Sequence, residues 1–175
     1  HYFNLKNSQI NAIISIFLAG YMLGQIIYGP LSNAWGRVRA LQTGLIINLI
    51  GITVSLIGIF THYYLIMLMG RFISALGASA GLVCTIILIN EGFKTSQAKQ
   101  LLAYATISFA MGIKLAVFIG GLLTAHYGWS TCFIFLLIYS VVMLLLSSQL
   151  KETLAFSSRQ TPNLSAILHN YKMAF

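Results

Sequence analysis

Two basic residues lie inside stretches that are otherwise apolar and uncharged, and they are the first candidates for chemistry. Arg71 is about nine residues into the stretch Tyr63–Ile89, which places it roughly 13 Å deep in a helix. Lys114 is about ten residues from the end of the stretch Leu101–Thr124, which places it roughly 15 Å deep. A charge at such depth in a membrane costs about 2.5–3.5 kcal/mol on insertion scales, so each is a functional candidate by default. In the alternative interpretation, Arg71 only snorkels to the membrane interface.

These two cations lie at similar depth, and no apolar stretch contains a carboxylate that would neutralise them. Three explanations are open: the side chains face different directions, Lys114 is neutral because desolvation disfavours its charged form, or an acidic partner comes from helices outside this sequence. A fourth is that Lys114 is a tolerated lesion in a diverging sequence. All four stay open at this point.

The elements that must position these residues are transmembrane helices. Hydrophobic residues make up 58% of the 175-residue chain and charged residues 7%, against about 25% charged residues in a soluble domain. A helix needs about 20 apolar residues to cross the bilayer core, where every backbone polar group must be satisfied within the helix. We therefore expect an all-α, polytopic membrane protein with five spans, at Gln9–Tyr28, Leu41–Phe60, Tyr63–Ile89, Leu101–Thr124 and Thr131–Gln149.

The basic residues mark the orientation of these spans. The formal net charge is +8, and only Glu91 and Glu152 are acidic. If the first span runs from outside to inside, Lys6 lies outside, and the inner side holds Arg37, Arg39, Lys94, Lys99, Lys151, Arg159 and Lys172. This is the positive-inside bias of membrane proteins, so the charge marks topology and does not indicate a nucleic-acid partner.

The other polar residues offer little for catalysis. No nucleophile–base–acid set or phosphate-binding loop can be assembled, so we expect no enzyme and no cofactor. His62 and His126 lie in expected outer loops without acidic or thiol ligands nearby, so we expect no metal site. Tyr21 and Gln25 lie one helical turn apart in the first span, where they line a cavity or, equally, pack between helices.

Three segments carry a resemblance to a known family. A short basic turn, Gly29–Arg39, follows the first span and supplies the motif residues Gly29, Leu31, Gly36 and Arg37. The third span contains the arginine-bearing segment Gly70–Ala78, and the fourth span ends in the segment Gly120–Trp129. In order and spacing these segments resemble the major facilitator superfamily of transporters, and they are most similar to its bicyclomycin-resistance-type drug:proton antiporters.

The resemblance implies a domain organisation. The five spans would be family helices 2 to 6, so residues 1–150 would form part of the N-terminal six-helix bundle. Residues 151–175 would form a cytoplasmic, inner-side linker with an amphipathic helix that begins near Thr161. The first helix and the C-terminal half of the transporter are expected outside this sequence.

The resemblance also implies roles for particular residues. The inner turn joins two helices in one conformational state, which makes Arg37 and Glu91 the expected ion pair; otherwise Arg37 only marks topology and Glu91 is solvated. Asn33 replaces the motif aspartate, so the latch is expected to be weaker. The implied sets are a gating turn (Gly29, Asn33, Gly36, Arg37, Glu91), a helix 5 antiporter motif (Gly120, Gly121), and Arg71 for proton coupling. Lys114 is a second proton-coupling or transport candidate because of its depth, and the family pattern does not contain it.

Departures from the family pattern leave the function with alternatives. Ser74 stands where glutamine is usual, and Ser130 replaces an arginine. By resemblance, the chain is part of an alternating-access exporter of drugs or other small amphipathic molecules, driven by proton entry, in a bacterial inner membrane. Its partners would be the lipid bilayer, the substrate, the proton and the remaining helices. The alternative is a non-transporting membrane remnant or helix-interaction module, and a channel-like oligomer is least favoured.

Overall fold

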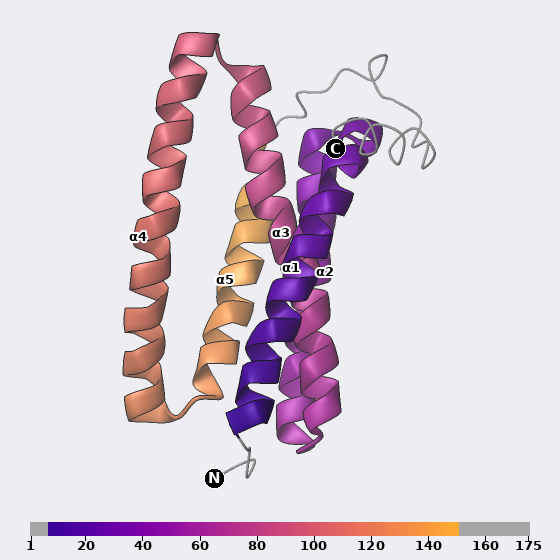
Figure 1. Cartoon of the computed structure of the whole chain (residues 1–175), viewed down its shortest axis with the longest axis vertical. Helices are drawn as coiled ribbons and strands as arrows, with labels where there is room; N and C mark the ends of the chain where they lie inside the picture. Colours follow the sequence, from indigo (N-terminus) through magenta and orange to yellow (C-terminus); the bar gives the residue numbers. More distant parts are fainter. Residues whose placement is uncertain (1–6, 151–175) are drawn as a thin grey trace.

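The computed structural model describes residues 7–150, which form five α-helices joined by short connections. The helices are α1 (Asn7–Trp35), α2 (Arg37–Phe60), α3 (Tyr64–Gly92), α4 (Thr95–Tyr127) and α5 (Thr131–Ser147). They run up and down in alternation, with α1, α2, α3 and α5 in one group and α4 standing apart (Figure 1). The expected all-α fold is confirmed.

Length and apolar composition explain why these helices suit a membrane. Four of them, α1 to α4, are long and apolar enough to cross a bilayer, and α5 is an apolar helix of 17 residues. Large apolar side chains are exposed on every helix, including Leu18, Phe60, Leu65, Phe118 and Leu145. In water such surfaces would be a liability, whereas in lipid they are the contact surface.

Glycines bring α2 and α3 into the closest contact of the fold. Gly44, Gly51 and Gly58 recur every seven residues along α2, so they form one stripe. A Cβ atom added at Gly51 would overlap the backbone of Ser74 in α3, and one added at Gly70 would overlap the backbone of Ser55 in α2. Close backbone approach through small residues is the usual basis of helix association in membranes.

The central helix α3 also packs against α1 through glycines. Gly20 and Gly24 of α1 face α3, and a Cβ at Gly24 would overlap Ser79. At the outer end, the Tyr64 hydroxyl donates a hydrogen bond to the Gln9 carbonyl at 2.8 Å. Helix α3 is therefore enclosed by α1 on one side and α2 on the other.

Helix α5 packs on α2 through polar contacts and one apolar cluster. The Asn48 amide donates to the Ser140 hydroxyl and the Gln42 amide to the Ser147 carbonyl, both at 3.2 Å. Near the outer ends, the buried side chains of Ile59, Met67 and Phe133 form a core cluster from α2, α3 and α5. Phe133 of this cluster also contacts Arg71, whose guanidinium carbon lies 4.8 Å from the centre of its ring.

Helix α4 contacts its neighbours only near its two ends. Its one buried residue is Ala98, and the half-buried residues are Leu101, Leu102 and Ala105 near the inner end and Ile119, Gly120 and Leu123 near the outer end. The middle of α4 is exposed on all sides, which agrees with its separation in Figure 1.

The prediction of a turn over Gly29–Arg39 is wrong, because most of this segment is helical. Helix α1 continues through Pro30 to Trp35, and Gly36 alone separates it from α2. Proline is tolerated within membrane helices because neighbouring groups and small backbone adjustments satisfy the carbonyl that it leaves free. The expected linker at residues 151–175, including the helix near Thr161, lies outside the described residues.

Candidate functional site: an inner latch and a mid-membrane arginine

The ion pair of the inner latch joins the start of α2 to the end of α3. Arg37 Nε donates to Glu91 Oε2 at 2.9 Å, and Arg37 Nη2 donates to Glu91 Oε1 at 2.5 Å. This bidentate geometry is the strongest arrangement open to a guanidinium and a carboxylate. The expected contact between Arg37 and Glu91 is therefore present, and its part in gating stays a prediction.

Asn33 brings α1 into the same contact. Arg37 Nη1 donates to the Asn33 Oδ1 atom at 2.5 Å, so one guanidinium connects α1, α2 and α3. Arg37 is only 6% exposed, whereas the Glu91 side chain is 38% exposed. The buried arginine depends on these acceptors because an unpaired buried charge is strongly unfavourable.

The two glycines of the expected gating turn differ in what they do. Gly36 has φ 112° and ψ 154°, a region that is essentially closed to side chains with a Cβ. That conformation lets α1 end and α2 begin within one residue. Asn33, near the end of α1, and Arg37, at the start of α2, are thereby close enough to form a hydrogen bond. Gly29 lies inside α1, and a Cβ added there would meet nothing within 4 Å. The structure therefore gives Gly36 a direct structural role and gives Gly29 none.

Arg71 forms a second site in the outer half of the bundle. Its guanidinium carbon lies 5.3 Å from the ring centre of Phe17 in α1 and 4.8 Å from that of Phe133 in α5. Stacking on aromatic faces stabilises a cation by about 2 kcal/mol or more when water is excluded. The Arg71 Nε atom is buried and has no hydrogen-bond partner among residues 7–150. The site thus holds a positive charge whose Nε–H group can still donate a hydrogen bond.

Tyr21 and Gln25 extend this site along α1. The rings of Phe17 and Tyr21 stack with centroids 6.3 Å apart, and a side-chain hydrogen bond links Tyr21 to Gln25. A row of three side chains on α1 therefore leads from Gln25 to the arginine. Phe17 and Phe133 were not predicted from the sequence. The position of Phe17 one helical turn before Tyr21 was the available signal for the first of them.

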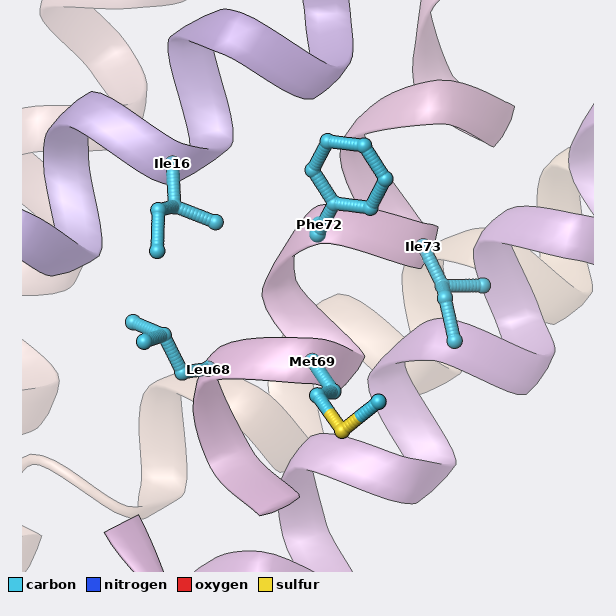
Figure 2. Close-up of a pocket in the computed structure, with 5 residues that line it drawn as sticks. All are labelled: Ile16, Leu68, Met69, Phe72 and Ile73. Atoms are coloured by element: carbon cyan, nitrogen blue, oxygen red, sulfur yellow. The ribbon is translucent and has the colours of Figure 1, made fainter. Parts of the chain in front are cut away.

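An apolar pocket lies between α1 and α3 beside this row. It has a volume of about 360 Å³ and is lined by Ile16, Leu68, Met69, Phe72 and Ile73. Figure 2 shows Ile16 on one helix and the other four side chains along the neighbouring helix. The pocket is an open apolar groove, since the Met69 side chain in its lining is 64% exposed, and its two helices are the ones that carry Phe17 and Arg71.

Lys114 and the antiporter motif residues Gly120 and Gly121 all lie on α4, the helix that stands apart from the Arg71 site. Lys114 is exposed in the middle of α4, away from Arg71 between α1 and α5. Gly120 contacts α5, where its carbonyl lies 3.6 Å from the Cys132 sulfur, and Gly121 faces open space. Of the explanations for two cations at one depth, the structure favours side chains that face different directions.

Metal binding has no candidate in the part of the chain that the structure describes, where no three His, Cys, Asp or Glu side chains come together. The two arginine sites differ in their partners: Arg37 is paired with a carboxylate and Arg71 is stacked on aromatic rings.

Comparison with known proteins gives consistent matches. A family model described as Major Facilitator Superfamily matches residues 1–168. The quinolone resistance protein NorB of Staphylococcus aureus strains JH9, Newman and USA300 is 28% identical over 154 residues. The match covers 86% of this chain and 32% of NorB, so the chain spans about a third of the length of these relatives. Neither finding identifies the bicyclomycin-resistance type, and that subtype stays a prediction.

Proposed function

Because this chain belongs to the Major Facilitator Superfamily, we propose that it is part of a transporter that exports small amphipathic molecules in exchange for protons. It is an integral membrane protein by family and by its apolar helices, and we place it in a bacterial plasma membrane because the relatives are bacterial. Residues 1–150 would be part of one helical bundle, and residues 151–175 would lie on the cytoplasmic side.

The observation that supports proton coupling most is the environment of Arg71. A permanent charge in the middle of a membrane helix is energetically costly, and residues of this kind commonly mark pathways for ions or substrates. Here the guanidinium is held between two rings, and its Nε lacks a partner among the described residues. In this proposal, Arg71 presents a donor to a carboxylate of the remaining helices and thereby favours release of the proton from that carboxylate.

The apolar pocket supports an amphipathic substrate. Its lining of Ile16, Leu68, Met69, Phe72 and Ile73 would take the apolar part of such a molecule. The row of Tyr21 and Gln25 would offer hydrogen bonds to the polar part. Because NorB is named a quinolone resistance protein, a fluorescent quinolone is the first substrate to test.

The inner latch supports alternating access. Contacts at helix ends that tie three elements together are suited to hold one closed conformation, and they must break when the inner side opens. We propose that the Asn33–Arg37–Glu91 contact closes the inner side of the bundle and that substrate loading requires its rupture.

The reading frame around the chain is the first test. The transporter proposal expects one apolar span upstream of His1 and six downstream of Phe175. Stop codons directly on both sides would contradict it and would favour the non-transporting alternative, which the replacements at Asn33 and Ser74 also favour. In the structure, the Ser74 hydroxyl donates to the Arg71 carbonyl three residues earlier, at 3.0 Å.

Efflux by the intact protein is the second test. Cells that express it are loaded with the fluorescent quinolone and energised, with Arg71→Ala as the test variant and Arg39→Gln as an exposed control. We expect Arg71→Ala to lose at least about 90% of the export rate, a tenfold loss that corresponds to about 1.4 kcal/mol. A protonophore should stop export by the unmodified protein. Export that persists in Arg71→Ala, or in the presence of the protonophore, would contradict proton coupling through Arg71.

A further inference from the structure

The connection between α4 and α5 is short and has a defined backbone geometry. Gly128 has φ 88° and ψ 159°, a conformation that is strained for any residue with a Cβ. Its backbone N–H donates to the Thr124 carbonyl at 3.2 Å, and its carbonyl accepts a hydrogen bond from the Thr131 N–H at 3.2 Å. The chain therefore leaves α4 and enters α5 in one geometry, which places the next residue, Trp129, against the start of α5.

Trp129 packs against Phe133, which lies one helical turn later. The two ring centroids are 6.1 Å apart and the ring planes cross at 80°, an edge-to-face arrangement that aromatic pairs prefer. Phe133 is 7% exposed and is buried with Ile59 and Met67, and Trp129 packs against the same cluster. The tryptophan ring therefore restricts the tilt of the phenylalanine ring.

The Phe133 ring also contacts Arg71 of α3. The guanidinium carbon lies 4.8 Å from the centre of this ring and 5.3 Å from that of Phe17. Two of the segments that carry the family resemblance, Gly70–Ala78 and Gly120–Trp129, thus meet at a phenylalanine that belongs to neither of them. A single ring links Trp129 to the cation.

Stacking is the contact that holds the Arg71 side chain in the described part of the protein. Its Nε atom has no hydrogen-bond partner among residues 7–150, and the carboxylate of Glu91 is paired with Arg37. A cation on an aromatic face follows the position of that ring, whereas a bidentate ion pair has directional bonds of its own. A change in the tilt of Phe133 would therefore displace the Arg71 guanidinium.

We propose that Trp129 is a positioning residue for Arg71: it fixes the Phe133 ring, which holds the guanidinium so that its Nε–H group points at the carboxylate of the remaining helices. This inference rests on the proposed proton coupling through Arg71 and adds a residue that touches neither the proton nor the substrate. Trp129 does not line the apolar groove, so its loss should impair coupling and spare substrate binding.

Nuclear magnetic resonance of the 175-residue chain in detergent micelles tests the contact without a transport measurement. The chain contains only four arginines, so nitrogen-15 arginine gives few Nε–H signals, and Arg71→Lys identifies the signal of interest. Phe133→Leu identifies its cross-peak with the Phe133 ring protons. We expect Trp129→Leu to weaken this cross-peak at least about threefold, because the phenylalanine ring loses the neighbour that restricts its tilt.

Transport by the intact protein tests the positioning role. In proteoliposomes, the rate of quinolone transport driven by a pH gradient is divided by the rate of quinolone exchange without a gradient. We expect Trp129→Leu to lower this ratio at least about tenfold, because a small displacement of a positioned group costs a large factor in rate. A purely structural defect would lower both rates and leave their ratio unchanged.

Two further variants assign the effect to the edge-to-face contact. Trp129→Phe keeps a ring that can pack against Phe133, so it should retain both the cross-peak and the ratio to within about twofold. Tyr127→Leu removes an aromatic side chain beside the same connection that is 76% exposed, and it should change neither measurement. If Trp129→Leu does not fold, Trp129→Phe decides: retention of both measurements supports the proposal, and loss of either overturns it.

The results that would overturn the proposal are distinct from failure of the proposed function. An unchanged cross-peak in Trp129→Leu would exclude positioning of Arg71 through Phe133. A weakened cross-peak with an unchanged ratio would exclude a role for Trp129 in coupling and leave proton coupling itself intact. Equal losses in Tyr127→Leu would exclude a specific role for Trp129. An unmodified protein that transports equally with and without the gradient would overturn proton coupling, and with it the step that Trp129 is proposed to support.

Discussion

At the scale of single residues, the protein holds the buried Arg37 and the half-buried Arg71 in different ways. Arg37 is neutralised by a bidentate carboxylate and an amide oxygen, so its donors are used by acceptors of known position. Arg71 is stacked between Phe17 and Phe133, which stabilises its charge without using its hydrogen-bond donors. The first arrangement suits a contact that must be made and broken, and the second suits a charge that must remain available.

A double-mutant cycle should detect the stacking of Arg71 on Phe133. We expect Phe133→Leu and Arg71→Met to be coupled by about 1–2 kcal/mol in the free energy of unfolding, because each change removes the same cation–π contact. The measurement is reversible unfolding in mixed micelles. Phe135→Leu, an exposed position on the same helix, should show coupling below about 0.3 kcal/mol. Equal coupling for both phenylalanines would refute the contact.

Gly36 and Gly29 provide a matched pair at the inner end. Gly36→Ala should destabilise the protein by about 1–3 kcal/mol, because φ 112° with ψ 154° is strained for a residue with a Cβ. Gly29→Ala should be neutral or stabilising by up to about 1 kcal/mol, because its site is helical and open. Thermal unfolding of the two variants in detergent compares them directly. A Gly29→Ala variant as unstable as Gly36→Ala would argue against a helix that continues to Trp35.

At the scale of helices, the position of each glycine decides how a pair of helices packs. The stripe of Gly44, Gly51 and Gly58 lets α2 approach α3 so closely that backbone atoms fill the space of a side chain. The spacing Gly20–Gly24 does the same for α1. In contrast, Gly81 of α3 has the same four-residue spacing from Gly77 but meets nothing within 4 Å. Spacing alone therefore does not show that a glycine is in contact, because the helix must also be rotated toward a neighbour.

Enlarging a glycine in the α2–α3 contact should separate the two helices. We expect Gly51→Val to lower the free energy of unfolding by at least about 3 kcal/mol, because the valine would overlap the backbone of Ser74. The same change at Gly112 of α4 meets no atom and should cost less than about 1 kcal/mol. Unfolding in mixed micelles, followed by circular dichroism, measures both. Similar losses at the two sites would contradict the packing described for α2 and α3.

At the scale of the whole molecule, the described helices divide into a packed group and a single exposed helix. About a third of the most apolar segment is buried in α2 and in α3, whereas none of that segment is buried in α4 (Figure 1). The latch lies at the inner end of the packed group, where Arg37 connects three helices. In the proposed mechanism, rupture of that contact lets the inner ends of these helices separate.

Changes in the latch should alter access to the inner end of the bundle. Ser32 is fully buried there, so a Ser32→Cys reporter should react slowly with a water-soluble thiol probe. Glu91→Gln should speed the reaction roughly tenfold, because Arg37 loses its charged partner. Asn33→Asp should slow it about threefold, because a charged acceptor bonds the guanidinium more strongly than an amide does. Arg39→Gln changes an exposed arginine two residues away and should leave the reaction rate unchanged. If neither Glu91→Gln nor Asn33→Asp changes the rate, gating by this contact is refuted.

The sequence by itself determined the helical class and the five apolar segments, four of which form helices long enough to cross a bilayer and one of which, α5, is shorter. The inner position of most basic residues stays a prediction. These features depend on local properties of the sequence. The length of an apolar run predicts a spanning helix, and the distribution of basic residues between the loops predicts its orientation. The motif residues Arg37 and Glu91 could be paired through resemblance, although they are 54 residues apart.

Only the tertiary structure decided which side chains surround these residues. Phe17 and Phe133 come to Arg71 from two other helices, and Lys114 turns away from all of them. The expected turn at Gly29–Arg39 became a continuous helix with a break at Gly36, because Pro30 was accommodated inside α1. The physical reason is common to these cases: the rotation of a helix about its axis and its distance from its neighbours depend on packing along its whole length, which no short segment encodes.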